Sequence, residues 1–214
     1  MKNKPDLLLH ICCAPCSTHA IDILAETYRI HAFFFNPNIY PPEEYYLRHQ
    51  ETRLYIEKLG LPFLSSPYSR KEWLATVQRY ADEAEGGKRC QKCFGYRLLE
   101  TAKMAASMDI LFFTTTLTTG PNKPASIIFP LAEKIAYDFG LTFVSHDFKK
   151  QNGFKKSCEI SRRLGMYRQN YCGCEYSLRD RIKLQKQAYR QRRSTEPYNG
   201  QKEYLPNKFP KTSL

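Results

Sequence analysis

Five short apolar runs recur along the chain, and stretches with helical spacing of apolar residues separate them. The runs occupy residues 6–12, 30–35, 61–65, 110–115 and 141–145. Continuous apolar strands that alternate with helices are typical of a parallel sheet whose two faces are both covered by helices. The pattern therefore predicts an α/β fold.

Residues at the ends of the helical stretches mark where helices begin and end. Residues 41–60, PPEEYYLRHQETRLYIEKLG, have proline and acidic residues at their start and glycine at their end. Ser17 is a candidate cap for the helix after the first strand. A polar helix is predicted from about residue 177. We therefore expect one domain over residues 1–193 that ends in a basic helix, followed by an extended or mobile tail over 194–214.

Composition places the chain among globular proteins. With 214 residues, 42% hydrophobic and 14% aromatic, it can fill one core. No run of about 18 apolar residues occurs, and the run after MKNKPD is too short for a signal peptide. We therefore expect a cytoplasmic protein.

The net charge of +12 is confined to one part of the chain. Residues 1–148 hold 16 basic and 16 acidic residues, whereas residues 149–214 hold 17 and 5. A basic region interleaved with tyrosines is expected of a surface that binds a polyanion. Nucleic acid fits better than a membrane, since no strongly apolar helix face accompanies the charge. The alternative is a basic face that is merely solvated.

Eight cysteines add a chemical hypothesis, because structural disulfides are rare in a reducing compartment. Seven of them form three sets: Cys12, Cys13 and Cys16 at the first strand-to-helix turn, Cys90 and Cys93 after a Gly-Gly loop, and Cys172 and Cys174 around one glycine. Cys158 stands alone, and burial in the core explains it equally well. The three sets predict a metal site. Zinc takes four ligands and would leave several thiols unexplained, so an iron–sulfur cluster with a second thiol function is favoured.

Six motifs in order resemble those of the QueH-type epoxyqueuosine reductases, over about residues 8 to 177. They are HICCAPCS, FFFNPNIYPPEEY, EGGKRCQKCFGYRL, FFTTTLTTGPNK, SHDFKKQNGF and GMYRQNYCGCEYS. The resemblance implies a Rossmann-like sheet of the adenine nucleotide alpha-hydrolase type, with a cysteine-rich metal site at the carboxyl end of the strands. It also implies an iron–sulfur cofactor and an oxidoreductase that converts epoxyqueuosine to queuosine at the wobble position of tRNA.

The resemblance also suggests roles for the cysteines. It implies Cys12, Cys13, Cys90 and Cys93 as ligands of a 4Fe-4S cluster. Cys172 and Cys174 then form a redox-active dithiol or ligate a second, mononuclear iron, and these two roles stay open. Cys16 is a candidate ligand of the same second metal. The alternative is that its thiol caps the first turn of a helix.

Conversion of an epoxide to an alkene takes two electrons and two protons and releases water. Iron can supply electrons and polarise the epoxide oxygen, while the protons need an acid and the electrons an external donor. Asp147 is the first candidate acid, with Tyr171 and His146 behind it. A helix cap or a hydrogen-bonded loop carboxylate is the alternative role for Asp147.

Polar residues after the second and fourth strands are candidates for contact with the modified base, or for satisfying turns. They are Asn36, Asn38, Tyr40, Thr115, Thr116 and Thr118. The candidate phosphate contacts are the cations that precede the Cys172 motif. They are Lys149, Lys150, Lys155, Lys156, Arg162, Arg163 and Arg168.

Two other functions compete with this one. A tRNA sulfur-transfer enzyme would carry a Ser-Gly-Gly-x-Asp-Ser phosphate loop after the first strand, where this chain has CCAPCS. The second alternative is a zinc-stabilised RNA-binding module without catalytic activity.

Overall fold

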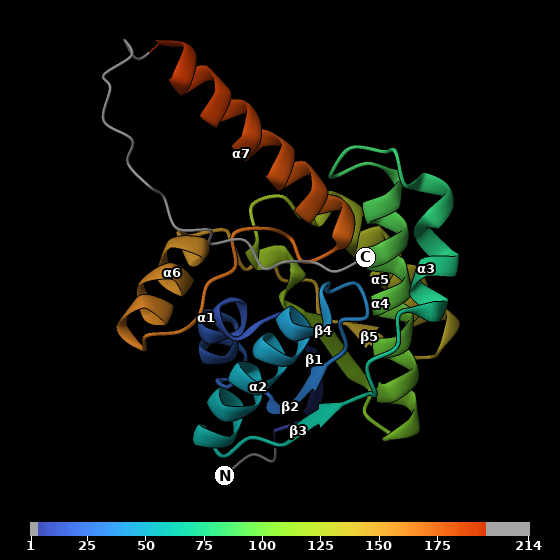
Figure 1. Cartoon of the computed structure of the whole chain (residues 1–214). Helices are drawn as coiled ribbons and strands as arrows, with labels where there is room; N and C mark the ends of the chain where they lie inside the picture. The colour runs from blue at the N-terminus through green and yellow to red at the C-terminus, as the bar shows by residue number, and fades with distance from the viewer. Residues whose placement is uncertain (1–3, 196–214) are drawn as a thin grey trace. The chain divides into compact units, whose positions relative to one another are not determined.

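A computed structural model describes residues 4–195 of the chain. It contains one parallel sheet in the order β3-β2-β1-β4-β5 (Figure 1). The strands are β1 (Asp6–His10), β2 (Arg29–Phe34), β3 (Phe63–Ser65), β4 (Phe112–Thr115) and β5 (Thr142–Phe143). All five predicted strands are present, so the predicted α/β fold with a parallel sheet is confirmed.

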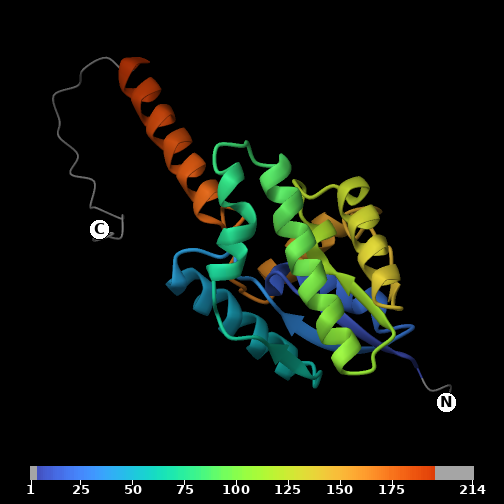
Figure 2. The ribbon, with the colours of Figure 1, turned by 90° about the vertical axis from the view of Figure 1, so that its right-hand side faces the viewer.

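Helices cover both faces of this sheet (Figures 1 and 2). The helices of the described residues are α1 (Ala14–Leu24), α2 (Pro42–Lys58), α3 (Lys71–Val77), α4 (Lys88–Ser107), α5 (Ala125–Asp138), α6 (Gly153–Arg163) and α7 (Glu175–Thr195), with 3-10 turns η1 (Gln78–Tyr80) and η2 (Thr116–Thr119). Leu7 and Leu9 of β1 pack with residues of α1 and α2, while Leu8 packs with residues of α4 and α5. Within residues 4–195, no helix combines the length and apolar character needed to cross a membrane.

The first helix begins differently from the prediction. The residue that precedes α1 is Cys13, in an extended conformation and without a side-chain cap. Ser17 lies inside the helix, and its hydroxyl donates to the carbonyl of Ala14 at 2.8 Å. The prediction of Ser17 as the cap was therefore wrong, because proline at the second helical position already starts the helix three residues earlier.

The order of the strands places a ligand site at one edge of the sheet. From β1 the chain runs outward through β2 to β3, and it then returns to place β4 on the other side of β1. Such a switch point leaves a crevice at the carboxyl ends of the central strands. The segments after β1, β2 and β4 meet there, and they carry the motifs HICCAPCS, FFFNPNIYPPEEY and FFTTTLTTGPNK.

The chain divides into two units, Met1–Leu178 and Arg179–Leu214, and α7 begins in the first and continues in the second. The expected domain limit at residue 193 stays a prediction. The expected tail lies, apart from its first two residues, outside the described residues.

Candidate metal and redox centre

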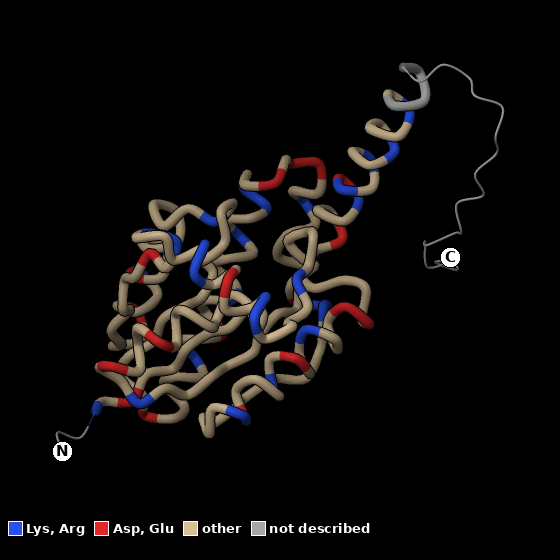
Figure 3. Tube along the Cα trace, turned by 90° about the vertical axis from the view of Figure 1, so that its left-hand side faces the viewer, with Lys and Arg blue, Asp and Glu red and all other residues tan. Residues whose placement is uncertain are grey.

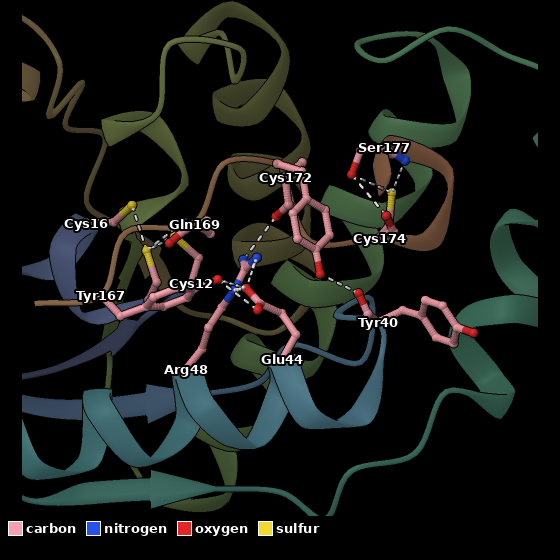
Figure 4. Close-up of polar contacts among 12 residues, drawn as sticks. Cys12, Cys16, Tyr40, Glu44, Arg48, Tyr167, Gln169, Cys172, Cys174 and Ser177 are labelled. Carbon is pink, nitrogen blue, oxygen red and sulfur yellow. Dashed lines mark hydrogen bonds and ion pairs between the residues drawn. The ribbon is translucent and has the colours of Figure 1, made fainter. Parts of the chain in front are cut away.

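Three thiols converge at the carboxyl end of the central strand (Figure 4). The sulfurs of Cys12, Cys13 and Cys16 all lie within 4.8 Å of one another. The Sγ atoms of Cys12 and Cys13 are 4.0 Å apart, and those of Cys13 and Cys16 are 3.0 Å apart. The last residue of β1 is His10, so the turn into α1 brings all three thiols to the predicted crevice. This grouping is a candidate metal site.

Hydrogen bonds make these thiols unequal. The neighbouring thiols of Cys13 and Cys16 stabilise the thiolate of Cys12, and its pKa lies well below the usual value. The same interactions raise the pKa of Cys13 to about 11 and raise the pKa of Cys16. The amide of Gln169 donates to Sγ of Cys13 at 3.2 Å, a contact that no sequence pattern indicated. Within this set, Cys12 loses its proton most readily.

The second set lies at the start of α4. Cys90 and Cys93 occupy its first two turns, after Gly87, as the Gly-Gly loop predicted. Cys90 accepts a hydrogen bond from the backbone N–H of Gly86 at 3.2 Å. Burial raises the pKa of Cys93 to about 12, so this thiol holds its proton until a metal displaces it. Cys90 packs against the hydrophobic core that includes Cys12 and Cys13, but neither Cys90 nor Cys93 belongs to the group of sulfurs that lie within 4.8 Å of one another.

The third set lies at a sharp bend of the chain. Gly173 has φ +127°, which favours glycine, and a Cβ there would lie 3.0 Å from a guanidinium nitrogen of Arg48. Arg48 donates to the carbonyl of Cys172 at 3.2 Å, and Figure 4 shows its side chain extending from α2 toward that carbonyl. Cys174 packs beside Cys93 and accepts a hydrogen bond from the N–H of Ser177 at 3.4 Å.

The backbone of Tyr40 is hydrogen-bonded to this bend. Its N–H donates to the carbonyl of Gly173 at 2.8 Å, and its carbonyl accepts from the Tyr171 hydroxyl at 2.5 Å. Burial raises the pKa of Tyr171, so the phenol keeps its proton. The NPNIY segment and the Cys172 motif therefore form one structure.

Buried cations surround the thiols, and their burial was not predicted. Arg89 and Arg97 are 1% and 2% exposed, and each has at least one guanidinium nitrogen without a hydrogen-bond partner. Burial opposes the charge of Lys123, but the negative charge of the nearby Cys172 and Cys12 thiolates outweighs it and raises the pKa of this lysine. Excess buried positive charge fits an anionic group such as a thiolate-ligated metal cluster. A sequence signal existed only for Arg97, which lies one helical turn after Cys93.

The polar residues at the strand ends are buried and bonded within the protein. Asn36 donates to the carbonyl of Ile11 at 2.9 Å, Thr115 pairs with His10 at 2.7 Å, and Thr116 accepts from the N–H of Cys12 at 3.1 Å. Asn38 is also buried, and its side-chain oxygen has no hydrogen-bond partner. Thr118 donates to the carbonyl of His146 at 2.9 Å. Contact of these residues with substrate stays a prediction.

The candidate acid Asp147 lies beside a lysine. Its Oδ1 is 3.4 Å from Nζ of Lys149, which also donates to the carbonyl of Lys123 at 3.1 Å. Asp147 is therefore linked to the Lys123 segment through Lys149, and among the described residues no hydrogen bond joins it to a thiol. The ring of His146 packs on Phe148 with centroids 4.6 Å apart. Neither placement tests the role in proton donation.

The candidate phosphate contacts are exposed, except for Lys149, which is half-buried. Arg168 donates to the hydroxyl of Ser161 at 2.6 Å and to Sγ of Cys158 at 3.0 Å. Cys158 lies in α6 and is half-buried, with Arg168 as its neighbour.

Comparison with known proteins gives one consistent result. The family model described as "Epoxyqueuosine reductase QueH" matches residues 7–180. A protein of that name from Streptococcus pyogenes serotype M1 is 33% identical over 195 residues, covering 86% of this chain and 76% of that protein. One from Thermotoga maritima is 34% identical over 181 residues, covering 82% and 91%.

A solved structure shares the fold. It is a predicted subunit of tRNA methyltransferase from Methanocaldococcus jannaschii, with a TM-score of 0.52 and 12% identity, covering 76% of this chain and 89% of that one. The family model and the relatives agree with the six motifs and with the thiols at the switch point. The chain therefore belongs to the epoxyqueuosine reductase QueH family of oxidoreductases.

Proposed function

We propose that this chain reduces epoxyqueuosine to queuosine in tRNA at the crevice where its three cysteine sets lie. The observation that carries the proposal is the convergence of Cys12, Cys13 and Cys16 within 4.8 Å at the end of β1. The reaction consumes the epoxide, two electrons and two protons, and yields the alkene and water.

A 4Fe-4S cluster held by Cys12, Cys13, Cys90 and Cys93 is the proposed cofactor. Two findings support it: Cys90 packs against the core that contains Cys12 and Cys13, and buried cations surround the sulfurs. When bound, such a cluster supplies electrons one at a time from an external donor.

Cys172 and Cys174 are proposed as the groups that act on the substrate side. As a dithiol, they would release two electrons and two protons on forming a disulfide, which balances the removal of one oxygen as water. As ligands of a second iron, with Cys16 in reach, they would instead help to polarise the epoxide oxygen. In both cases Gly173 and Arg48 hold the pair in place.

Residues around the thiols would orient the base and move protons. Asn38 and Tyr40 belong to the segment after β2, and Thr116 belongs to the segment after β4. Both segments meet at the crevice. Asp147 is proposed to deliver protons, because its buried Oδ1 makes no internal hydrogen bond and lies 3.4 Å from the ammonium group of Lys149.

Two groups of cations are each proposed to contact tRNA: those of the segment 149–168, and those on one face of α7. Arg179, Lys183, Lys186 and Arg190 are exposed and follow one another at intervals of four, three and four residues. This spacing places them on one face of the helix. Figure 3 shows the repeated basic positions along α7. A row of cations fits a phosphate backbone.

A series of cysteine variants tests the function. Cys172→Ala and Cys174→Ala should abolish conversion of epoxyqueuosine in tRNA while most of the iron and sulfide remains. Cys12→Ala or Cys90→Ala should lose the cluster itself. Cys158→Ala is the matched control and should retain both activity and iron. Iron and sulfide analysis of anaerobically prepared protein, with mass spectrometry of the tRNA nucleosides, measures both properties.

Two results would refute this assignment. Full activity of the Cys172→Ala/Cys174→Ala double variant would make the third set structural. Full iron and sulfide retention in Cys90→Ala would remove the second set from the cluster. The family match does not favour a sulfur-transfer enzyme or a zinc-stabilised RNA-binding module, and a colourless wild-type protein containing zinc would revive the latter.

A further inference from the structure

Arg97 places a positive charge in the interior beside the thiols. Its guanidinium donates to Oδ1 of Asn36, and Nη2 lies 3.5 Å from Nε2 of His10. Its Nε has no hydrogen-bond partner. Within residues 4–195, no carboxylate forms an ion pair with it.

The surroundings of Arg97 do not balance this charge. The oxygen that accepts its hydrogen bond belongs to a neutral amide. The ring of His10 contacts the hydroxyl of Thr115 and the carbonyl of Phe35, and neither of these groups carries a charge. A buried ion without a counter-charge strongly destabilises a fold, so an anionic partner is expected.

Thiols of two different sets lie on the segments that hold Arg97. Cys93 is one turn earlier in α4, and Asn36, which accepts from Arg97, also donates to the carbonyl of Ile11, the residue before Cys12. Arg97 thus lies between two of the sets that are proposed to hold the cofactor. Lys103, near the end of the same helix, instead pairs with Glu100 at the surface at 2.7 Å.

We propose that Arg97 is the fixed counter-charge of the cysteine centre, stabilising negative charge on Cys12 and Cys93 and thereby raising the reduction potential of the cofactor they hold. This inference rests on the proposed iron–sulfur cofactor. Uptake of one electron from a low-potential reductant makes the centre more negative, with no bond formed or broken. A guanidinium that keeps its proton stabilises the reduced state more than the oxidised state.

Asn36 positions the guanidinium. Its side chain is 1% exposed, and it is tied to the segment after β1 because its Nδ2 donates to the carbonyl of Ile11. The other end of the amide accepts from Arg97. Arg97 is thereby held against the same segment that carries Cys12.

Three variants test the proposal in the cluster-loaded protein. Arg97→Gln removes the charge, Arg97→Lys keeps it, and Lys103→Gln removes a surface charge from the same helix. The measurements are iron and sulfide content and the midpoint potential from an anaerobic dithionite titration followed by visible and EPR spectra. We expect Arg97→Gln to retain iron with a lower midpoint potential, and the other two variants to match the wild type.

Every other outcome either supports the inference or overturns it. An unchanged potential in iron-loaded Arg97→Gln would make Arg97 purely structural. If Arg97→Gln loses iron, recovery of iron and potential in Arg97→Lys supports the role of charge, and failure of both variants overturns it. A wild-type protein without an iron–sulfur cluster refutes the proposed cofactor and the inference with it. A loaded wild type whose potential Arg97→Gln does not change refutes the inference alone.

Discussion

Individual thiols of the centre differ because different atoms touch them. Cys12 has two thiols and the hydroxyl of Thr116 as neighbours, whereas Cys93 lies among apolar side chains that include Trp73 and Val77. The first environment stabilises a thiolate and the second a thiol. Metal binding to Cys93 must therefore release a proton, so metal retention should weaken as the pH falls.

His10 carries a pH-dependent part of the stability. Its pKa in the folded chain is lowered to about 3, against 6.5 for an unperturbed histidine. Below pH 6.5 the unfolded chain takes up a proton that the folded chain does not. The free energy of unfolding therefore decreases as the pH is lowered. The loss from pH 7.5 to 5.5 should be about 1.4 kcal/mol. Denaturant unfolding of wild type and His10→Gln at both values measures it, and an equal loss in both proteins would contradict this account.

Elements were predicted better than the contacts between them. Apolar runs and the residues at helix ends are local signals, which is why the five strands, the start of α2 at Pro42 and the start of α4 after Gly87 agree with the sequence. Burial of Arg89 and Arg97 depends on long-range packing, which a lysine- and arginine-rich helix start does not reveal. The Ser17 cap failed because proline two residues earlier competed with it.

The first turn of α4 depends on Arg89. Its guanidinium donates to the carbonyl of Ala81 at 2.9 Å and also to that of Glu83, which fixes the loop leading to Cys90. Arg89→Met should lower the free energy of unfolding by about 1–3 kcal/mol and weaken iron retention, because these half-buried carbonyls lose their donor. Lys88→Gln, at the neighbouring position outside the core, should have little effect on either. Equal stability of the two variants would show that the loop before Cys90 does not depend on the hydrogen bonds of Arg89.

At the scale of the whole molecule, charge and chemistry are divided along the sequence. The thiols of the first two sets lie in residues 1–148, which have no net charge, while the excess of +12 lies in residues 149–214. The third set and the proposed phosphate contacts share this second part. Sequence alone could predict this division because it depends only on counting, whereas no count could show which cations are buried.

Affinity for tRNA should therefore depend strongly on salt. Replacing Lys149, Lys150, Lys155 and Lys156 with Gln should flatten the slope of log affinity against log salt, by up to about one unit for each phosphate that is no longer neutralised. Replacing Lys183, Lys186 and Arg190 in α7 should do the same. Filter binding at several salt concentrations measures the slopes, with Lys103→Gln as the control. Unchanged slopes in both multiple variants would leave the basic region as a solvated face.

The three cysteine sets also affect how the protein is made. They lie at residues 12–16, 90–93 and 172–174, whereas the last strand of the sheet ends at Phe143. During synthesis, every strand of the sheet is therefore translated before the last two thiols are added. Cofactor insertion that needs all three sets then awaits synthesis of residues 172–174, so a chain truncated before them would have a complete sheet and an incomplete centre.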